Sequence, residues 1–214
     1  MKKKVNQTKI SKKRVNKLLI ATTNPGKFAE LKKYLEELPV KFISLADLKI
    51  TEVPVENGRD FMGNAVLKAE FYSKIAKLPT IADDGGLEIF ALGGEPGVNS
   101  HRWLKGKEAT DEELINYTLN RMRPFKGDQR RAQLRAVIAL SIPGKKTVTS
   151  EAMISGVIAE KPSKNRIRGY PYRSLFLVTQ FKKYYDDLTD EEHEIVNHRK
   201  KALEKIKNHL VNES

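Results

Sequence analysis

The fold is decided by the stretch LLIATTNPGKFAEL, residues 18–31. The apolar run at residues 18–21 is followed by turn-forming residues and predicts a short buried strand. Asn24 then supplies a helix cap, and Pro25 suits the first helical position, where an N–H would have no partner. Apolar side chains continue at helical spacing, at Phe28, Leu31 and Leu35. The stretch therefore predicts a strand, a turn and a helix, which is the repeating unit of an α/β fold.

The turn between this strand and helix has the features of an anion site. The first N–H groups of a helix lack partners within the helix, and the helix dipole favours negative charge there. Lys27 adds a full positive charge, so we predict a phosphate site made of Thr22, Thr23, Asn24, Pro25, Gly26 and Lys27. The stretch is not a Walker P-loop, which needs a longer glycine-framed loop. The alternative is an ordinary capped helix with a surface lysine.

The rest of the chain predicts a mixed sheet with flanking helices. Helices are expected after Asp60, after Thr110 with its capping-box partner Glu113, and towards the end of the chain. The expected strands cover residues 41–45, 79–82 and 87–91, the last two separated by a polar kink, and a long hairpin covers residues 131–142 and 147–160. We therefore expect an α/β fold with a two-lobed mixed sheet around a central cleft.

Charge is concentrated at the beginning of the chain. The 214 residues carry a net charge of +13, with 39% hydrophobic and 31% charged residues. Residues 1–17 contain eight Lys or Arg and no acid. The rest of the chain has 32 basic and 27 acidic residues, and therefore a net charge of +5. We expect residues 1–16 to form a basic, flexible extension and residues 17–214 to form a single two-lobed domain. The extension has no aromatic residue for stacking on bases, so a solubilising role is favoured over nucleic-acid contact.

Two absences narrow the classes of function. The chain has no cysteine, which excludes disulfides, a thiol nucleophile and thiolate zinc sites. No apolar run approaches the roughly 20 residues that span a bilayer, and no stretch resembles a signal peptide. We therefore expect a cytoplasmic protein without membrane contact.

Acidic residues suggest a metal site near the predicted turn. Asp83 and Asp84 stand between an apolar strand and Gly85-Gly86, and adjacent carboxylates repel each other unless a cation compensates them. Mg²⁺ takes hard oxygen ligands and bridges substrate phosphates, and Glu56 is a third candidate carboxylate. The alternative is a solvated turn, because Asp and Gly are common in turns.

Basic side chains elsewhere are candidates for binding the rest of a nucleotide. Lys68 is flanked by small and apolar residues, so it points either into a cleft or, as a snorkelling side chain, to the surface. His198 and Arg199 follow Val196-Asn197 in a charged helical stretch and are candidates for reading a base or pairing with phosphate.

These motifs, in this order, resemble the inosine triphosphate pyrophosphatase family, whose members remove deaminated purine nucleotides. The matching segments are ATTNPGK at 21–27, ENGRDFMGNAVLKA at 56–69, PTIADDGGLEIFALGGEPGVNSHR at 79–102 and, more weakly, NHRKKAL at 197–203. The resemblance covers residues 17–210. It implies an elongated, two-lobed α/β fold, a homodimer, and Mg²⁺-dependent hydrolysis of nucleoside triphosphates such as ITP, dITP and XTP to the monophosphate and pyrophosphate.

The resemblance also implies roles for individual residues. The turn at residues 22–27 would hold phosphate, with Lys27 and Lys68 as catalytic cations. Glu56 and Asp84 would bind Mg²⁺, and Asp84 would act as the general base on water. Asp83 would be an auxiliary carboxylate of the metal site, and His198 and Arg199 would contact the base.

The sequence departs from the family pattern in the half that reads the base. The family usually has Ser after the acidic pair, where this chain has Gly85. Its Gly-Phe-Gly-Tyr-Asp-Pro segment is replaced at residues 169–174, where the candidate base-binding residues are Tyr170, Pro171, Tyr172 and Arg173. Arg173 stands where an acid is usual, and His193 stands where a lysine is usual. Gly85 and His193 are also candidates for binding the substrate.

Three hypotheses of function follow. The first is a Mg²⁺-dependent nucleoside-triphosphate pyrophosphatase. The second is a nucleotide-binding homologue on the same scaffold, with altered base specificity or little catalysis. The third is an RNA-associated protein that works through its basic extension. A screen for pyrophosphate release across purine and pyrimidine triphosphates separates the first from the others.

Overall fold

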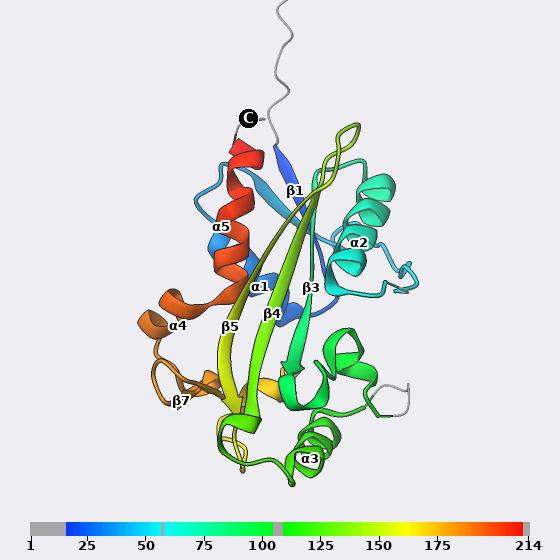
Figure 1. Ribbon diagram of the computed structural model, residues 1–214. Coiled ribbons are helices and arrows are strands. Elements are labelled where there is room, and N and C mark those ends of the chain that lie inside the picture. The colour runs from blue at the N-terminus through cyan, green and yellow to red at the C-terminus, as the bar shows by residue number, and fades with distance from the viewer. Residues whose placement is uncertain (1–15, 57, 105–108, 212–214) are drawn as a thin grey trace, which may run out of the picture.

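The computed structural model describes residues 16–56, 58–104 and 109–211 (Figure 1). Its strands are β1 (Lys17–Ala21), β2 (Lys41–Ser44), β3 (Thr80–Ile89), β4 (Arg131–Ser141), β5 (Val148–Ile158), β6 (Phe176–Val178) and β7 (Lys183–Tyr184). They form one mixed sheet in the order β2-β1-β3-β4-β5-β6-β7. β1 is parallel to β2 and β3, whereas every pairing from β3 onward is antiparallel. The predicted mixed sheet and the long β4–β5 hairpin are confirmed.

The described α-helices are α1 (Pro25–Leu35), α2 (Phe61–Ala76), α3 (Asp111–Met122), α4 (Asp190–Val196) and α5 (His198–Val211). Three of these five helices, α1, α2 and α3, begin at the predicted caps. Asn24 Oδ1 accepts hydrogen bonds from two N–H groups of the first turn of α1, Asp60 caps α2, and Thr110 forms a capping box with Glu113 at α3. These caps are visible in the sequence because each joins residues only two or three positions apart.

β1 is apolar throughout because both faces of the sheet are covered there. Leu18 and Ile20 point to the face covered by α1 and α5, where they pack with Leu31 and Leu203. Leu19 points to the opposite face and packs beneath α2, since successive side chains of a strand alternate between faces. Figure 1 shows α5 and α2 on opposite sides of the long strands.

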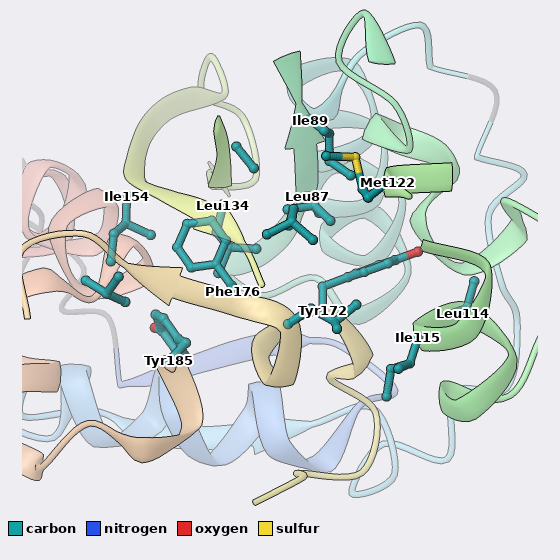
Figure 2. Close-up of a cluster of buried hydrophobic side chains, with 14 of the residues drawn as sticks. Leu87, Ile89, Leu114, Ile115, Met122, Leu134, Ile154, Tyr172, Phe176 and Tyr185 are labelled. Atoms are coloured by element: carbon teal, nitrogen blue, oxygen red, sulfur yellow. The ribbon is translucent and has the colours of Figure 1, made fainter. Parts of the chain in front are cut away.

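A third hydrophobic cluster fills the far end of the long strands, beside α3 (Figure 2). Leu87 of β3 and Leu134 of β4 pack there with Tyr172 and Phe176. Ala82 of β3 belongs to the cluster beneath α2. The four residues between Ala82 and Leu87 are therefore the acidic pair and its two glycines, which lie between two packed regions of the molecule.

The predicted break in β3 is wrong. Residues 83–86 were expected to form a polar kink, but Thr80–Ile89 is one continuous strand paired with β4 along its whole length, with Asp83 opposite Ile138 and Gly86 opposite Arg135. The alternative of a solvated turn is wrong for the same reason, because Asp83 is only 3% exposed. The ladder of β4 and neighbouring cations stabilise these acids inside the sheet. Phe90 and Ala91, expected to end the strand, form a short 3₁₀ helix (Phe90–Leu92) instead.

Two further sequence predictions concern membrane contact and the basic extension. Within residues 16–56, 58–104 and 109–211, no helix is both long and apolar enough to cross a bilayer. The predicted basic extension lies outside the described residues, apart from residue 16.

Candidate active site

A groove lies beside the end of β1 and the middle of β3, with a volume of about 1560 Å³ that includes open solvent. Of the predicted phosphate turn, Thr22, Thr23, Asn24 and Lys27 line the groove, whereas Pro25 and Gly26 do not. The groove also contains the remaining predicted catalytic and metal residues, namely Glu56, Lys68, Asp83 and Asp84. The structure thus brings together residues that are up to 62 positions apart in the chain.

The beginning of α1 is already satisfied by its own cap. Asn24 Oδ1 accepts from the N–H groups of Gly26 at 2.9 Å and Lys27 at 3.2 Å. Thr22 Oγ1 in turn accepts from the N–H of Asn24 at 3.2 Å. The groups left to meet an anion are therefore mainly side chains, with the ammonium of Lys27 carrying the full charge.

Lys68 bridges two acids that line the groove, Asp84 and Glu56. Its Nζ lies 2.7 Å from Asp84 Oδ1 and 3.6 Å from Glu56 Oε1. Burial raises the pKa of Asp84 above its usual value, although the charge of Lys68 opposes this. Burial disfavours the charged form of Lys68, but Asp84 and Glu56 outweigh this and raise its pKa. Two carboxylates therefore converge on one point that a cation occupies.

Asp83 has a different environment from its neighbour. Its Oδ2 lies 2.7 Å from Lys27 Nζ, and its Oδ1 accepts from Arg199 Nε at 3.3 Å. Burial alone would raise the pKa of Asp83, but Arg199 and Lys27 hold it well below its usual range. Both oxygens are thus paired with cations, which argues against the prediction that Asp83 belongs to a metal site. Asp83 is better described as the buried counter-ion of Lys27 and Arg199.

The remaining donor set fits Mg²⁺. Among the described residues, no group of three His, Cys, Asp or Glu side chains is placed to hold a metal ion. Mg²⁺ does not require one, because it commonly takes one or two carboxylates and completes its shell with phosphate oxygens and water. Glu56 and Asp84 provide hard oxygen atoms of this kind, and their shared contact with Lys68 Nζ shows that they face a common cationic position.

A second pocket adjoins the groove and contains most of the predicted base-binding residues. It has a volume of about 480 Å³, open solvent included, and is lined by Lys27, Gly85, Gly86, Leu87, Ser100, Leu134, Gly169, Tyr170, Pro171, Tyr172, Arg173, His198 and Arg199. Lys27, Gly85 and Ser100 line both cavities. The groove and the aromatic pocket are therefore continuous at these three residues.

The wall formed by residues 169–173 is fixed from several sides. Tyr172 is buried, and its hydroxyl donates to the backbone oxygen of Ser100 at 2.5 Å. Pro171 is the first residue of a short 3₁₀ helix (Pro171–Leu175), where its missing N–H needs no partner. The Arg173 guanidinium lies 3.7 Å above the Tyr170 ring centroid. The divergent segment therefore forms a packed wall.

The two histidines that were predicted to bind substrate, His193 and His198, lie in different environments. His198 is 2% exposed and lines the aromatic pocket. Burial holds its pKa well below the usual value, so its imidazole is neutral. His193 lines neither cavity; its ring contacts Tyr185, with the centroids 4.9 Å apart. The prediction that His193 binds substrate is therefore not supported by its position, because Tyr185 is its aromatic neighbour.

Gly85 lines both cavities, and its backbone leaves no room for the serine expected at this position. A Cβ atom there would collide with the backbone oxygen of Arg135 on β4. The chain therefore lacks the hydroxyl group that the family pattern places after the acidic pair, because the close pairing of β3 with β4 leaves no space for that side chain.

Glu30 is a residue of this region that the sequence did not reveal, as is Ser100, which lines both cavities. Glu30 lies on α1, and its side chain is 14% exposed between Arg173 and Arg199. Burial alone would raise the pKa of Glu30, but Arg199 and Arg173 lower it to about 2. Its spacing of three positions from Lys27 places both on one face of the helix. That spacing was the available signal, although it does not identify partners more than 140 residues away.

Comparison with known proteins places the chain in a family. The model of the Ham1 family matches residues 18–209. The chain belongs to the Ham1 family. Among the relatives of this Ham1-family protein is a dITP/XTP pyrophosphatase of Thermus thermophilus, 43% identical over 187 residues, which are 87% of this chain and 88% of the relative. A dITP/XTP pyrophosphatase of Bacillus subtilis is 39% identical over 188 residues, covering 88% and 93% of the two chains.

Solved structures agree with this assignment. The Ham1 protein of Staphylococcus aureus superimposes with a TM-score of 0.79 at 32% identity, covering 93% of this chain and 100% of that one. A nucleoside-triphosphatase, dITP/XTP pyrophosphatase, of Mycobacterium abscessus gives a TM-score of 0.73 at 33% identity, covering 89% and 98%. The resemblance inferred from the motifs and the α/β fold class are both confirmed.

Proposed function

We propose that this Ham1-family protein hydrolyses deaminated purine nucleoside triphosphates, of the dITP and XTP class, to the monophosphate and pyrophosphate. One observation carries the proposal: a groove with two lysine–carboxylate pairs opens into an aromatic pocket at Lys27, Gly85 and Ser100. The relatives named dITP/XTP pyrophosphatase support the choice of substrate.

In the groove, Lys27 and Lys68 neutralise the triphosphate. Phosphoryl transfer depends on charge neutralisation and on alignment of the attacking water more than on a covalent nucleophile. Asp83 keeps the ammonium of Lys27 at the groove wall through the 2.7 Å ion pair. Lys68, held by Asp84 and Glu56, provides the second positive charge.

Asp84 is the proposed general base. A carboxylate with a raised pKa is a better proton acceptor than an ordinary Asp. Asp84 takes a proton from the attacking water as the water oxygen bonds to the α phosphorus. The anhydride bond between the α and β phosphates breaks, and pyrophosphate leaves. Mg²⁺, which we propose is held by Glu56 and Asp84, supplies positive charge to the phosphate oxygens and polarises water when bound.

The aromatic pocket is the proposed base site. Tyr170 and Tyr172 give it apolar surface, and His198 and Arg199 give it polar groups. His198 Nδ1 is buried without a hydrogen-bond partner among the described residues, and a buried polar atom of this kind is costly unless a ligand satisfies it. A deaminated purine presents a carbonyl oxygen and a ring N–H, which match a guanidinium donor and a neutral imidazole acceptor.

We also propose a homodimer that acts in the cytoplasm. The homodimer is supported by the family resemblance, and the cytoplasm by the absence of cysteine from the chain. Sedimentation equilibrium of the purified protein measures the first; a purely monomeric species at micromolar concentration would contradict it. Fractionation of cells expressing the protein measures the second.

The test of the proposed function is a pyrophosphate-release screen with and without Mg²⁺. We expect release from dITP and XTP to exceed release from ATP, GTP and pyrimidine triphosphates, and to require the metal. Asp84→Asn should lower kcat by at least about a hundredfold, in line with losses of a general base. Asp128→Asn is the matched control, since Asp128 is exposed far from the groove.

Two outcomes would count against this proposal. Turnover of Asp84→Asn at the wild-type rate would contradict the role of Asp84. Saturable nucleotide binding without pyrophosphate from any triphosphate would favour the second hypothesis, a nucleotide-binding homologue.

A further inference from the structure

Arg173 lines the aromatic pocket, but its charge is not directed to an open position. Its side chain is 11% exposed, and Nη2 lies 3.0 Å from Glu30 Oε2. The same guanidinium lies 3.7 Å above the centroid of the Tyr170 ring and 4.9 Å from that of Tyr185. Planar stacking and an ion pair together restrict a guanidinium to one orientation. Arg173 is thus held by the protein on two sides.

Glu30 is itself fixed, which makes it a firm anchor for Arg173. Its Oε1 accepts from Asn197 Nδ2 at 2.8 Å, and its Oε2 lies 3.5 Å from Arg199 Nη1. Arg199 in turn holds Asp83. If the charge of Glu30 is removed, Arg199 keeps Asp83 as its partner, whereas Arg173 loses the partner that holds it.

Tyr170 connects this charge cluster with the beginning of α1. A Cβ atom added at Gly26 would lie 2.9 Å from Tyr170 Cε2 and 3.2 Å from its hydroxyl oxygen. The edge of the ring therefore rests on the first turn of α1, while Arg173 covers its face. Arg173, in the place where Glu30 holds it, therefore covers one face of the ring and limits its movement away from α1.

We propose that Arg173 is a positioning residue: anchored by Glu30, it presses Tyr170 against the start of α1 and so fixes the wall of the base pocket without reading the base itself. The inference rests on the proposed function, because it assigns a role within the same substrate site. It also explains how an arginine is accommodated where the family pattern has an acid. Glu30 neutralises the arginine, and the tyrosine ring accepts its planar face.

The experiment measures KM, kcat and inhibition by inorganic tripolyphosphate, a probe that fills the phosphate groove but has no base. Loss of a desolvated cation–π contact and its ion pair should raise KM of Arg173→Gln for dITP and XTP by about tenfold or more, with kcat within about threefold. KM should rise by the same factor for dITP and XTP, and the inhibition constant of tripolyphosphate should stay unchanged. Arg123→Gln is the matched control, because Arg123 is exposed at the end of α3.

A double-mutant cycle shows whether Arg173 acts through Tyr170. In a Tyr170→Leu background, Arg173→Gln should raise KM by no more than about twofold, because the ring it positions is gone. Fully additive effects would overturn the proposal. So would a changed ratio between dITP and XTP, which indicates direct reading of the base, or weaker inhibition by tripolyphosphate, which indicates contact with phosphate.

Glu30→Gln provides a second route if Arg173→Gln does not fold. It leaves the arginine in the chain but removes its anchor, so KM should rise for both nucleotides and tripolyphosphate inhibition should again be unchanged. An unchanged KM in this variant would overturn the proposal. If the wild-type protein releases no pyrophosphate, the proposed function fails separately, and the same comparisons are made with the dissociation constant of dITP.

Discussion

Glu30 carries a buried charge whose effect extends beyond the residue itself. It accepts a hydrogen bond from Asn197 and pairs with two arginines of different elements, Arg173 and Arg199. Burial disfavours its ionised form, and the two guanidinium groups reverse this, which lowers its pKa to about 2. A carboxyl group whose pKa is lower in the folded than in the unfolded chain stabilises the fold while it is ionised.

The stabilising effect of Glu30 should depend on pH. The pKa of Glu30 has its ordinary value of about 4.5 in the unfolded chain and is about 2 in the folded chain. The contribution is therefore complete above about pH 4.5 and is lost as pH falls towards 2. We expect Glu30→Gln to lower the free energy of unfolding by about 3 kcal/mol at pH 7, with the difference from wild type shrinking below pH 4.5.

Urea denaturation at a series of pH values measures this difference. Glu36→Gln, an exposed position just after α1, is the control with the same chemical change. A difference between wild type and Glu30→Gln that stays constant from pH 7 to pH 3 would show that the charge of Glu30 is not the cause.

At the scale of elements, the far end of the molecule depends on one buried arginine. Arg130 ends a short 3₁₀ helix (Gly127–Arg130) just before β4. It donates to four backbone oxygens, those of Met122, Phe125, Ile158 and Ala159. These oxygens belong to the end of α3, the turn after it, and the end of β5 and the residue after it. Arg130 therefore joins α3 to the hairpin beside the cluster of Figure 2.

Removal of this side chain should loosen the junction. Arg130→Ala leaves several buried carbonyl groups without a donor, so we expect the free energy of unfolding to fall by about 2 to 4 kcal/mol. Chemical denaturation measures the loss. Arg131→Ala, at the exposed neighbouring position, is the control and should change stability by less than about 0.5 kcal/mol. Equal losses for both variants would contradict the role of Arg130.

At the scale of the whole molecule, the described core and cavities are built from residues that follow the basic extension in the chain. The three hydrophobic clusters consist of residues between Leu18 and Leu210, and both cavities are lined by residues from Ala21 onward. In the sequence, the eight basic residues of positions 1–17 all precede the residues that line the groove.

Deletion of residues 1–15 should therefore leave hydrolysis unchanged. We expect kcat and KM for dITP within about twofold of the full chain, because no contact described within the fold is removed. Retention on immobilised RNA, measured in parallel and at increasing salt, tests the third hypothesis. Loss of retention after the deletion would support an RNA-binding extension, and unaltered retention would exclude one. A large loss of activity would show that the extension contributes to the site.

Local features of the fold follow from the sequence by itself. The caps at Asn24, Asp60 and Thr110, the β4–β5 hairpin and the apolar strand β1 were predictable, because each depends on residues close together in the chain. The motifs also allowed the family to be identified. The candidate groove residues that the motifs named, from Thr22 to Asp84, do lie together, although their chemical roles stay predictions.

Only the tertiary structure decided how the charges are paired. Asp83 and Asp84 are neighbours in the sequence, yet one is the buried partner of Arg199, 116 positions away, and the other is the partner of Lys68, 16 positions away. The continuity of β3 through both acids depends on pairing with β4 and on these cations, which local propensity does not contain. Glu30 and Arg173 meet across 143 positions for the same reason. Burial and electrostatic pairing are properties of packed elements, so the partners could not be identified from the pattern of residues alone.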